Sequence, residues 1–261
     1  MNTLRWMILA GVVLAMRLLP AFAQTHVDPA YPIHDRDRPQ PRVVDPGTAS
    51  TQSQPGRPPA DAVVLFAGRD LAQWRQQDGS APKWKVGDGY FEVVPGSGYL
   101  YTREAFGDCQ LHVEFAEPDP PRGEDQNRGN SGVFLQGLYE VQVLDSYQSL
   151  TYPDGQASAV YGQFPPLVNA SRPPGIWQTY DLVFHGPRFD AAGHLTRPAR
   201  MTVLHNGVLV QDDVELTGPT GHHQRPPYTA GPAQLPLALQ DHGDPVRYRN
   251  IWIRPLPEAA H

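Results

Sequence analysis

The chain has 261 residues, of which 29 are proline, and a formal net charge of −6. Proline at roughly twice its average frequency favours loops and excludes an architecture of long helices. The modest negative charge disfavours nucleic acid as a partner, because phosphate binding needs a basic surface. The single cysteine, Cys109, excludes an internal disulfide.

The first 23 residues predict a secretory signal peptide. Arg5 supplies the positive n-region, residues 7–15 the apolar core, and residues 21–23 an Ala-x-Ala cleavage site. Arg17 interrupts the apolar stretch, which is too short to span a bilayer, so cleavage is favoured over a membrane anchor. We therefore expect a periplasmic or secreted protein with no stable membrane span.

Residues 24–60 are rich in proline and poor in apolar side chains. They cannot bury enough surface to order themselves, so we predict a disordered linker or a wrapped arm. The composition changes at Asp61, which is the expected start of one domain over residues 61–257. Residues 258–261 are then a short tail.

Within that domain, short apolar or alternating segments separated by turn signals predict strands. They cover residues 62–66, 84–86, 90–94, 99–102, 109–115, 139–143, 177–185, 200–205, 208–211, 235–242 and 246–253. Residues 109–115 alternate as a half-buried antiparallel strand does. Asn206-Gly207 supplies the two positive-φ residues of a type I′ hairpin turn. Without helical periodicity of useful length, the pattern predicts an all-β sandwich or barrel, and in a jelly roll one concave sheet face often carries the site.

The segment 139–146 carries the first polar cluster. A period of two places Glu140 and Gln142 on one face, opposite two valines. Asp145 falls on the valine side unless a β-bulge near Leu144 returns it to the polar face. Carboxylates are depleted in strands, and a pair of them can divide acid and base roles. A polar strand face with routine hydrogen bonds is the alternative.

A second cluster is Gln240, Asp241 and His242. In an extended chain Gln240 and His242 share a face, and Asp241 points the other way unless the strand ends there. The three could bind sugar hydroxyls, orient one another or ligate a cation. The alternative is a turn at the end of a strand, with Asp241 capping backbone and Gly243 at positive φ.

Arg247 and Arg249 form a third cluster on one strand face. They could pair with Glu140 or Asp145, or clamp an oxygen-rich ligand. The alternative is a structural role, in which the arginines form ion pairs within the sheet.

Two irregular regions differ in what they predict. The long loop 146–175 contains several aromatic residues, among them Tyr161, which favours a role as the wall of a pocket. His222 and His223 lie in a Gly/Pro-rich loop without metal-ligand spacing, which favours solvated histidines. Nucleotide-binding and serine-hydrolase motifs do not occur in the sequence.

Taken together, the segments 128–134, 139–146, 175–181, 205–208 and 239–251 resemble the 3-keto-disaccharide hydrolase domain family, and the likeness covers roughly residues 61–256. The resemblance implies a concanavalin A-like jelly-roll β-sandwich and secretion or periplasmic residence. It also implies action on 3-keto-glycosides that a partner sugar oxidoreductase makes. One departure is Ile176, which stands where the family pattern has glutamate.

The implied chemistry starts from the ketone at C3, which acidifies the hydrogen on C2. A base can remove that hydrogen while the C1 oxygen leaves, and addition of water then completes the reaction; direct hydrolysis by paired carboxylates is the alternative. We expect Glu140 as the base and Asp145 or Asp241 as the acid or a cation ligand. His242 and Arg247 would polarise the ketone or hold hydroxyls.

The expected substrate-binding residues are Asn130, Gln142, Tyr161, Gln240, Arg247 and Arg249. No cofactor is required by the sequence. A divalent cation could bind, because several oxygen ligands converge, but no ligand spacing demands one. The competing function is a non-catalytic, lectin-like carbohydrate-binding domain, since a jelly roll with the same polar face suits both; an envelope scaffold without a deep polar pocket is a third.

Overall fold

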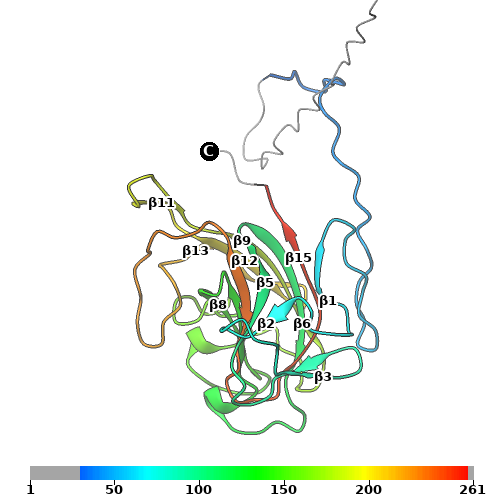
Figure 1. Ribbon diagram of the computed structural model, residues 1–261, viewed down its shortest axis with the longest axis vertical. Coiled ribbons are helices and arrows are strands. Elements are labelled where there is room, and N and C mark those ends of the chain that lie inside the picture. The colour runs from blue at the N-terminus through cyan, green and yellow to red at the C-terminus, as the bar shows by residue number, and fades with distance from the viewer. Residues whose placement is uncertain (1–29, 258–261) are drawn as a thin grey trace, which may run out of the picture.

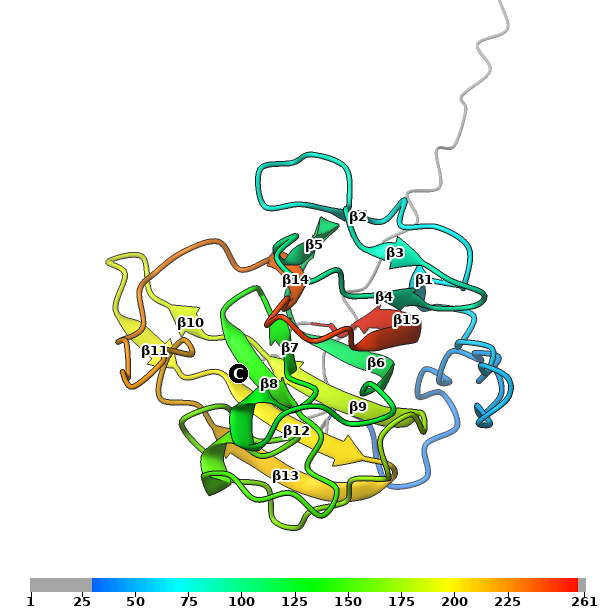
Figure 2. The same ribbon diagram turned by 90° about the horizontal axis from the view of Figure 1, so that it is seen from below.

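The computed structural model describes residues 30–257, so the predicted signal peptide and the C-terminal tail lie outside the described residues. The described chain folds into antiparallel β-sheets, and Figures 1 and 2 show the strands of the two main sheets lying over one another. This is the predicted concanavalin A-like jelly-roll sandwich. No helix within residues 30–257 is long and apolar enough to cross a membrane.

The larger sheet has the strand order β13-β12-β9-β6-β15-β4-β3, with β1 also paired to β15. Its strands are β1 (Val63–Phe66), β3 (Lys85–Val86), β4 (Phe91–Glu92), β6 (Cys109–Ala116), β9 (Gln178–His185), β12 (Arg200–His205), β13 (Val208–Glu215) and β15 (Arg247–Pro255).

The smaller sheet has the order β2-β5-β14-β7-β8. Its strands are β2 (Trp74–Arg75), β5 (Leu100–Phe106), β7 (Ser131–Leu135), β8 (Tyr139–Val143) and β14 (Leu235–Leu239). A separate ribbon pairs β10 (Arg188–Phe189) with β11 (Leu195–Arg197), and two short 3-10 helices, η1 (Asp125–Asn127) and η2 (Pro153–Gly155), lie in the long loops.

The core lies between the two sheets and fixes which face of β8 packs against the larger sheet. The ring centroids of Tyr139 on β8 and Phe184 on β9 are 5.5 Å apart. The hydroxyl of Tyr180 on β9 donates to the backbone oxygen of Gln142 at 2.6 Å. Because side chains alternate along a strand, Glu140 and Gln142 face away from this core. The predicted alternation of β8 therefore places the polar cluster on the outer face of the smaller sheet.

The two clearest local predictions are confirmed. Cys109 and the other apolar residues of β6 are buried, as the alternation requires. The turn between β12 and β13 has Asn206 at φ 53° and Gly207 at φ 80°, the left-handed geometry that Asn-Gly favours.

Residues 50–52 lie against the outer face of the larger sheet. Arg249 donates to the backbone oxygens of Thr51 at 2.6 Å and Gln52 at 3.2 Å. The Gln52 amide exchanges two hydrogen bonds with the backbone of Trp177, at 2.9 and 2.8 Å. This segment covers Glu114 of β6, which accepts a hydrogen bond from Ser50 and is fully buried although it faces outward.

Candidate functional site

The site is a cavity of about 600 Å³ on the outer face of the smaller sheet, and most of its lining residues carry a polar group. Its volume lies in the range of small-molecule sites. The residues that line it are Tyr99, Gln126, Asn130, Phe134, Glu140, Gln142, Tyr152, Tyr161, Thr220, Gly221, His222, Gln240 and His242. Six of the residues predicted from sequence therefore meet here, namely Asn130, Glu140, Gln142, Tyr161, Gln240 and His242.

Glu140 is the carboxylate of this cavity. Its side chain is 4 % exposed and has no ion-pair partner among residues 30–257. Burial raises the pKa of Glu140 to about 8, because the charged form loses its hydration without gaining a cation. Gly132 on the neighbouring strand makes room for it, since a Cβ there would lie 2.4 Å from Oε1 of Glu140. A carboxyl that titrates near neutrality can accept or give a proton.

Amide side chains surround this carboxyl. Gln142 lies 3.0 Å from Gln126, and Asn130 donates to the backbone oxygen of Gln126 at 2.7 Å. With the Gln142 amide turned over, its nitrogen lies 3.2 Å from Oε1 of Glu140 and 3.2 Å from the backbone oxygen of Ser131. Gln142 is thereby able to donate a hydrogen bond to Glu140.

Gln240 carries an unused acceptor. Its nitrogen donates to the hydroxyl of Tyr99 at 2.8 Å, but its buried Oε1 has no hydrogen-bond partner among the described residues. A buried polar atom normally has a partner, so an unpaired oxygen in the cavity lining suits a ligand hydroxyl.

Two loops bring a tyrosine and a histidine beside Glu140 by binding its backbone. The backbone N–H of Tyr161 donates to the Glu140 oxygen at 3.2 Å. The Glu140 N–H in turn donates to the hydroxyl of Thr220 at 2.9 Å, two residues before His222. The Tyr161 hydroxyl lies 3.2 Å from Nδ1 of His222 and 2.6 Å from the hydroxyl of Tyr152. A chain of three proton-carrying groups therefore reaches the cavity that holds Glu140.

The structure places the other two predicted acids outside the cavity. Asp145 follows the end of β8, is buried, and accepts from Nε of Arg128 at 2.7 Å. Asp241 accepts from the backbone N–H of Gly243 at 3.0 Å, which is the turn that the sequence offered as the alternative, and from the backbone N–H of Gly98 at 2.9 Å. Both carboxylates are therefore occupied by hydrogen bonds within the protein.

Both predicted arginines also lie away from the cavity. Arg249 pairs with Glu114, Nε to Oε2 at 2.7 Å, rather than with Glu140 or Asp145. Arg247 lies over the rings of Tyr90 and Trp177 at 5.6 and 5.5 Å. The face that these arginines share is the surface on which residues 50–52 dock.

Sequence reasoning missed several lining residues, above all His222. The loop that carries it is remote in sequence and was expected to hold solvated histidines; His222 is exposed, yet it also lines the cavity. The aromatic content of residues 146–175 did signal a pocket wall, which Tyr152 and Tyr161 provide. Ile176, the departure from the family pattern, is 40 % exposed and lies outside the cavity.

The described residues offer no cluster of metal ligands. Among residues 30–257, no group of three or more His, Cys, Asp or Glu side chains is arranged to hold a metal ion.

Comparison with known proteins confirms the resemblance stated above. A family model described as the 3-keto-alpha-glucoside-1,2-lyase-like domain matches residues 61–254. A candidate glycosyl hydrolase from Parabacteroides distasonis, solved at 2.13 Å resolution, is 39 % identical with a TM-score of 0.82, over 90 % of this chain and 99 % of its own. A search of curated proteins finds no match.

Two further candidate glycosyl hydrolases from the same organism share the fold. One, solved at 1.70 Å, is 18 % identical with a TM-score of 0.55, over 75 % of this chain and 94 % of its own. The other, solved at 2.00 Å, is 19 % identical with a TM-score of 0.54, over 75 % of this chain and 99 % of its own.

Proposed function

This chain belongs to the 3-keto-alpha-glucoside-1,2-lyase-like domain family, and we propose that it is a glycoside-cleaving enzyme that acts on 3-keto-glycosides in the cavity around Glu140. The observation that carries the proposal is a buried carboxyl with no cationic partner among the described residues, placed in a cavity of hydroxyl, amide and imidazole groups. Burial raises the pKa of this carboxyl to about 8. Such a carboxyl can take up and release a proton near neutral pH, as a general base must.

In the proposed reaction Glu140 removes the proton on C2. The electron pair of the C2–H bond forms the C1–C2 double bond, and the C1–O bond breaks with its electrons leaving on oxygen. The ketone at C3 makes this proton acidic, because the developing negative charge delocalises onto the ketone oxygen. Water then adds across the new double bond, so the net result is hydrolysis.

The leaving oxygen needs a proton from a second group. Asp145 and Asp241 are committed to Arg128 and to backbone amides. Tyr161 and His222 line the same cavity as Glu140 and are hydrogen-bonded to one another. We assign the proton delivery to this pair, with Tyr161 presenting the proton and His222 replacing it.

The remaining lining groups suit a sugar. The unpaired Oε1 of Gln240 can accept from a ring hydroxyl, and the amide of Asn130 can donate to a hydroxyl oxygen, while Gln142 holds the Glu140 carboxyl. His242 is exposed at the cavity and can donate to the ketone oxygen. These contacts orient C2 toward Glu140, which lowers the entropic part of the barrier.

The decisive test replaces Glu140 by glutamine, which keeps the shape and removes the base. We expect kcat on a 3-keto-glucoside to fall by about 100-fold or more. Glu104→Gln, at an exposed glutamate outside the cavity, is the matched control and should retain full activity. Full activity in Glu140→Gln would remove Glu140 as the base, and binding without turnover by the unaltered protein would favour the lectin-like function.

Isotope exchange separates the two routes of cleavage. When the reaction is run in deuterated water, elimination and hydration place enzyme-dependent deuterium at C2 of the product. Direct hydrolysis leaves that hydrogen in place. Repeating the reaction with and without a chelator tests whether a divalent cation takes part.

We propose a setting for the reaction from the N-terminal sequence and the substrate. Residues 1–23 read as a secretory signal, which supports a periplasmic or secreted location. A 3-keto-glycoside arises by oxidation of the C3 hydroxyl, so a sugar oxidoreductase must act first. Cell fractionation with an antibody to the protein tests the location.

A further inference from the structure

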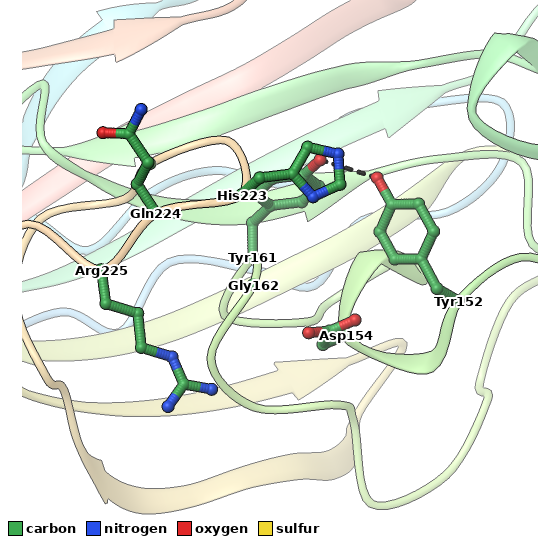
Figure 3. A pocket seen from close by; sticks show the side chains of 8 residues that line it. Tyr152, Asp154, Tyr161, Gly162, His223, Gln224 and Arg225 are labelled. Carbon is green, nitrogen blue, oxygen red and sulfur yellow. Dashed lines mark hydrogen bonds between the residues drawn. The ribbon is translucent and has the colours of Figure 1, made fainter.

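A second cavity of about 590 Å³ adjoins the proposed catalytic cavity (Figure 3). It is lined by Tyr152, Asp154, Tyr161, Gly162, Gly221, His223, Gln224 and Arg225. Tyr152, Tyr161 and Gly221 line both cavities, so the two hollows are neighbours with a common wall.

The common wall is built by two tyrosines. Their hydroxyls meet at 2.6 Å, and Figure 3 shows this contact at the edge of the second cavity. The proposed proton donor, Tyr161, therefore stands at the junction of the two hollows. A substrate whose scissile oxygen lies beside Tyr161 would place its oxidised ring on the Glu140 side and its leaving group on the other side.

The second cavity offers two charged groups that the fold does not use. The side chains of Asp154 and Arg225 form no hydrogen bond or ion pair within residues 30–257. They come from different loops, Asp154 from η2 and Arg225 from the segment that follows the histidine pair, and Figure 3 shows both beside the same hollow. A charged side chain that is already paired within the fold has few hydrogen-bonding groups left for a ligand. The carboxylate of Asp154 and the guanidinium of Arg225 are therefore available to one.

The chemistry of these groups suits a neutral ring that carries several hydroxyls. A guanidinium can donate two parallel hydrogen bonds to neighbouring oxygens, and a carboxylate accepts from hydroxyls. The ring of Tyr152, 39 % exposed, offers an apolar face against which the C–H face of a sugar can pack. One positive and one negative group give no net preference for an anionic or a cationic leaving group.

We propose that this second cavity is the binding site for the leaving-group sugar of a 3-keto-disaccharide, with Arg225 and Asp154 as its hydrogen-bonding residues. The inference rests on the proposed function, because it assumes that cleavage takes place beside Glu140. It makes the protein selective for disaccharides over glycosides with a small leaving group.

The test compares two substrates on each variant. Arg225→Ala and Asp154→Asn are assayed with a 3-keto-disaccharide and with methyl 3-keto-glucoside, whose methyl group is too small to reach the second cavity. We expect kcat/KM for the disaccharide to fall about tenfold, as the loss of a charged hydrogen bond implies, and kcat/KM for the methyl glycoside to change less than about twofold. Arg69→Ala, at an exposed arginine outside both cavities, is the control.

The outcomes separate this inference from the proposed function. A loss confined to the disaccharide supports the second site. Equal effects on the two substrates, or no effect on either, overturn the second site and leave the proposed function standing. If the unaltered protein cleaves neither substrate, the proposed function fails and the second site fails with it.

Discussion

At the scale of a single residue, the pKa of Glu140 sets the pH dependence of the proposed reaction. Burial raises this pKa to about 8, and the base acts only in its deprotonated form. We predict that kcat/KM rises about tenfold per pH unit below neutrality and levels off above about pH 8. A steady-state pH profile measures this. A flat profile through the neutral range would show that Glu140 is not the base.

The Tyr161–His222 pair makes a separate prediction about the leaving group. His222→Asn removes the imidazole that resupplies the proton, so kcat should fall by about 100-fold for a leaving group that needs protonation, such as an alkoxide. A nitrophenolate leaves without help and should lose far less. His194→Asn is the control, at an exposed histidine outside both cavities. Equal losses for both leaving groups would contradict the role.

A site residue could be predicted from the sequence where its position depends on a single strand, and not where it depends on contacts between distant segments. Glu140 and Gln142 followed from the period of two along a single strand. Asp145 did not, because β8 ends at Val143 and the partner of Asp145 is Arg128, on the preceding loop. His222 could not be placed at all, since its loop is held to Glu140 by Thr220, 80 residues away.

At the scale of the element, the features that were predicted correctly are those that depend on neighbouring residues. The Asn206-Gly207 turn and the alternation of β6 are properties of a few adjacent residues. The pairing of β15 with β6 joins segments more than a hundred residues apart. Such pairing depends on which apolar faces meet in the core, so the sequence predicted the class of fold but not the order of the strands.

The docking of residues 50–52 on the larger sheet gives a prediction for that segment. Gln52→Ala removes both hydrogen bonds to the backbone of Trp177, which together are worth about 1–3 kcal/mol. Hydrogen exchange of the backbone amides of residues 50–52 and of Trp177 should then become faster by about tenfold or more. Ser53→Ala is the control, since among residues 30–257 the Ser53 hydroxyl bonds to the neighbouring Thr51 hydroxyl and not to the sheet. Unchanged protection in Gln52→Ala would mean that other contacts hold the segment.

At the scale of the whole molecule, stability depends on a second buried carboxyl, Glu117. It is fully buried at the end of β6, and its two oxygens accept from Nε2 of Gln178 at 2.7 and 2.8 Å. Burial raises the pKa of Glu117 from its ordinary 4.5 to about 8. Between these values the folded state holds a proton that the unfolded chain has lost. The stabilisation is therefore complete below about pH 4.5 and is lost as the pH rises to about 8.

Replacing Glu117 by glutamine removes this difference in bound protons between the folded and the unfolded state. The free energy of unfolding of the unaltered protein should fall as the pH rises from about 5 to about 8, and that of Glu117→Gln should fall less steeply by about 1.4 kcal/mol per pH unit. A slope remains, because Glu140 is also buried with a raised pKa. Urea unfolding at several pH values measures both slopes, with Glu104→Gln as the exposed control. Identical slopes in Glu117→Gln and the unaltered protein would show that Glu117 is already ionised in the folded state.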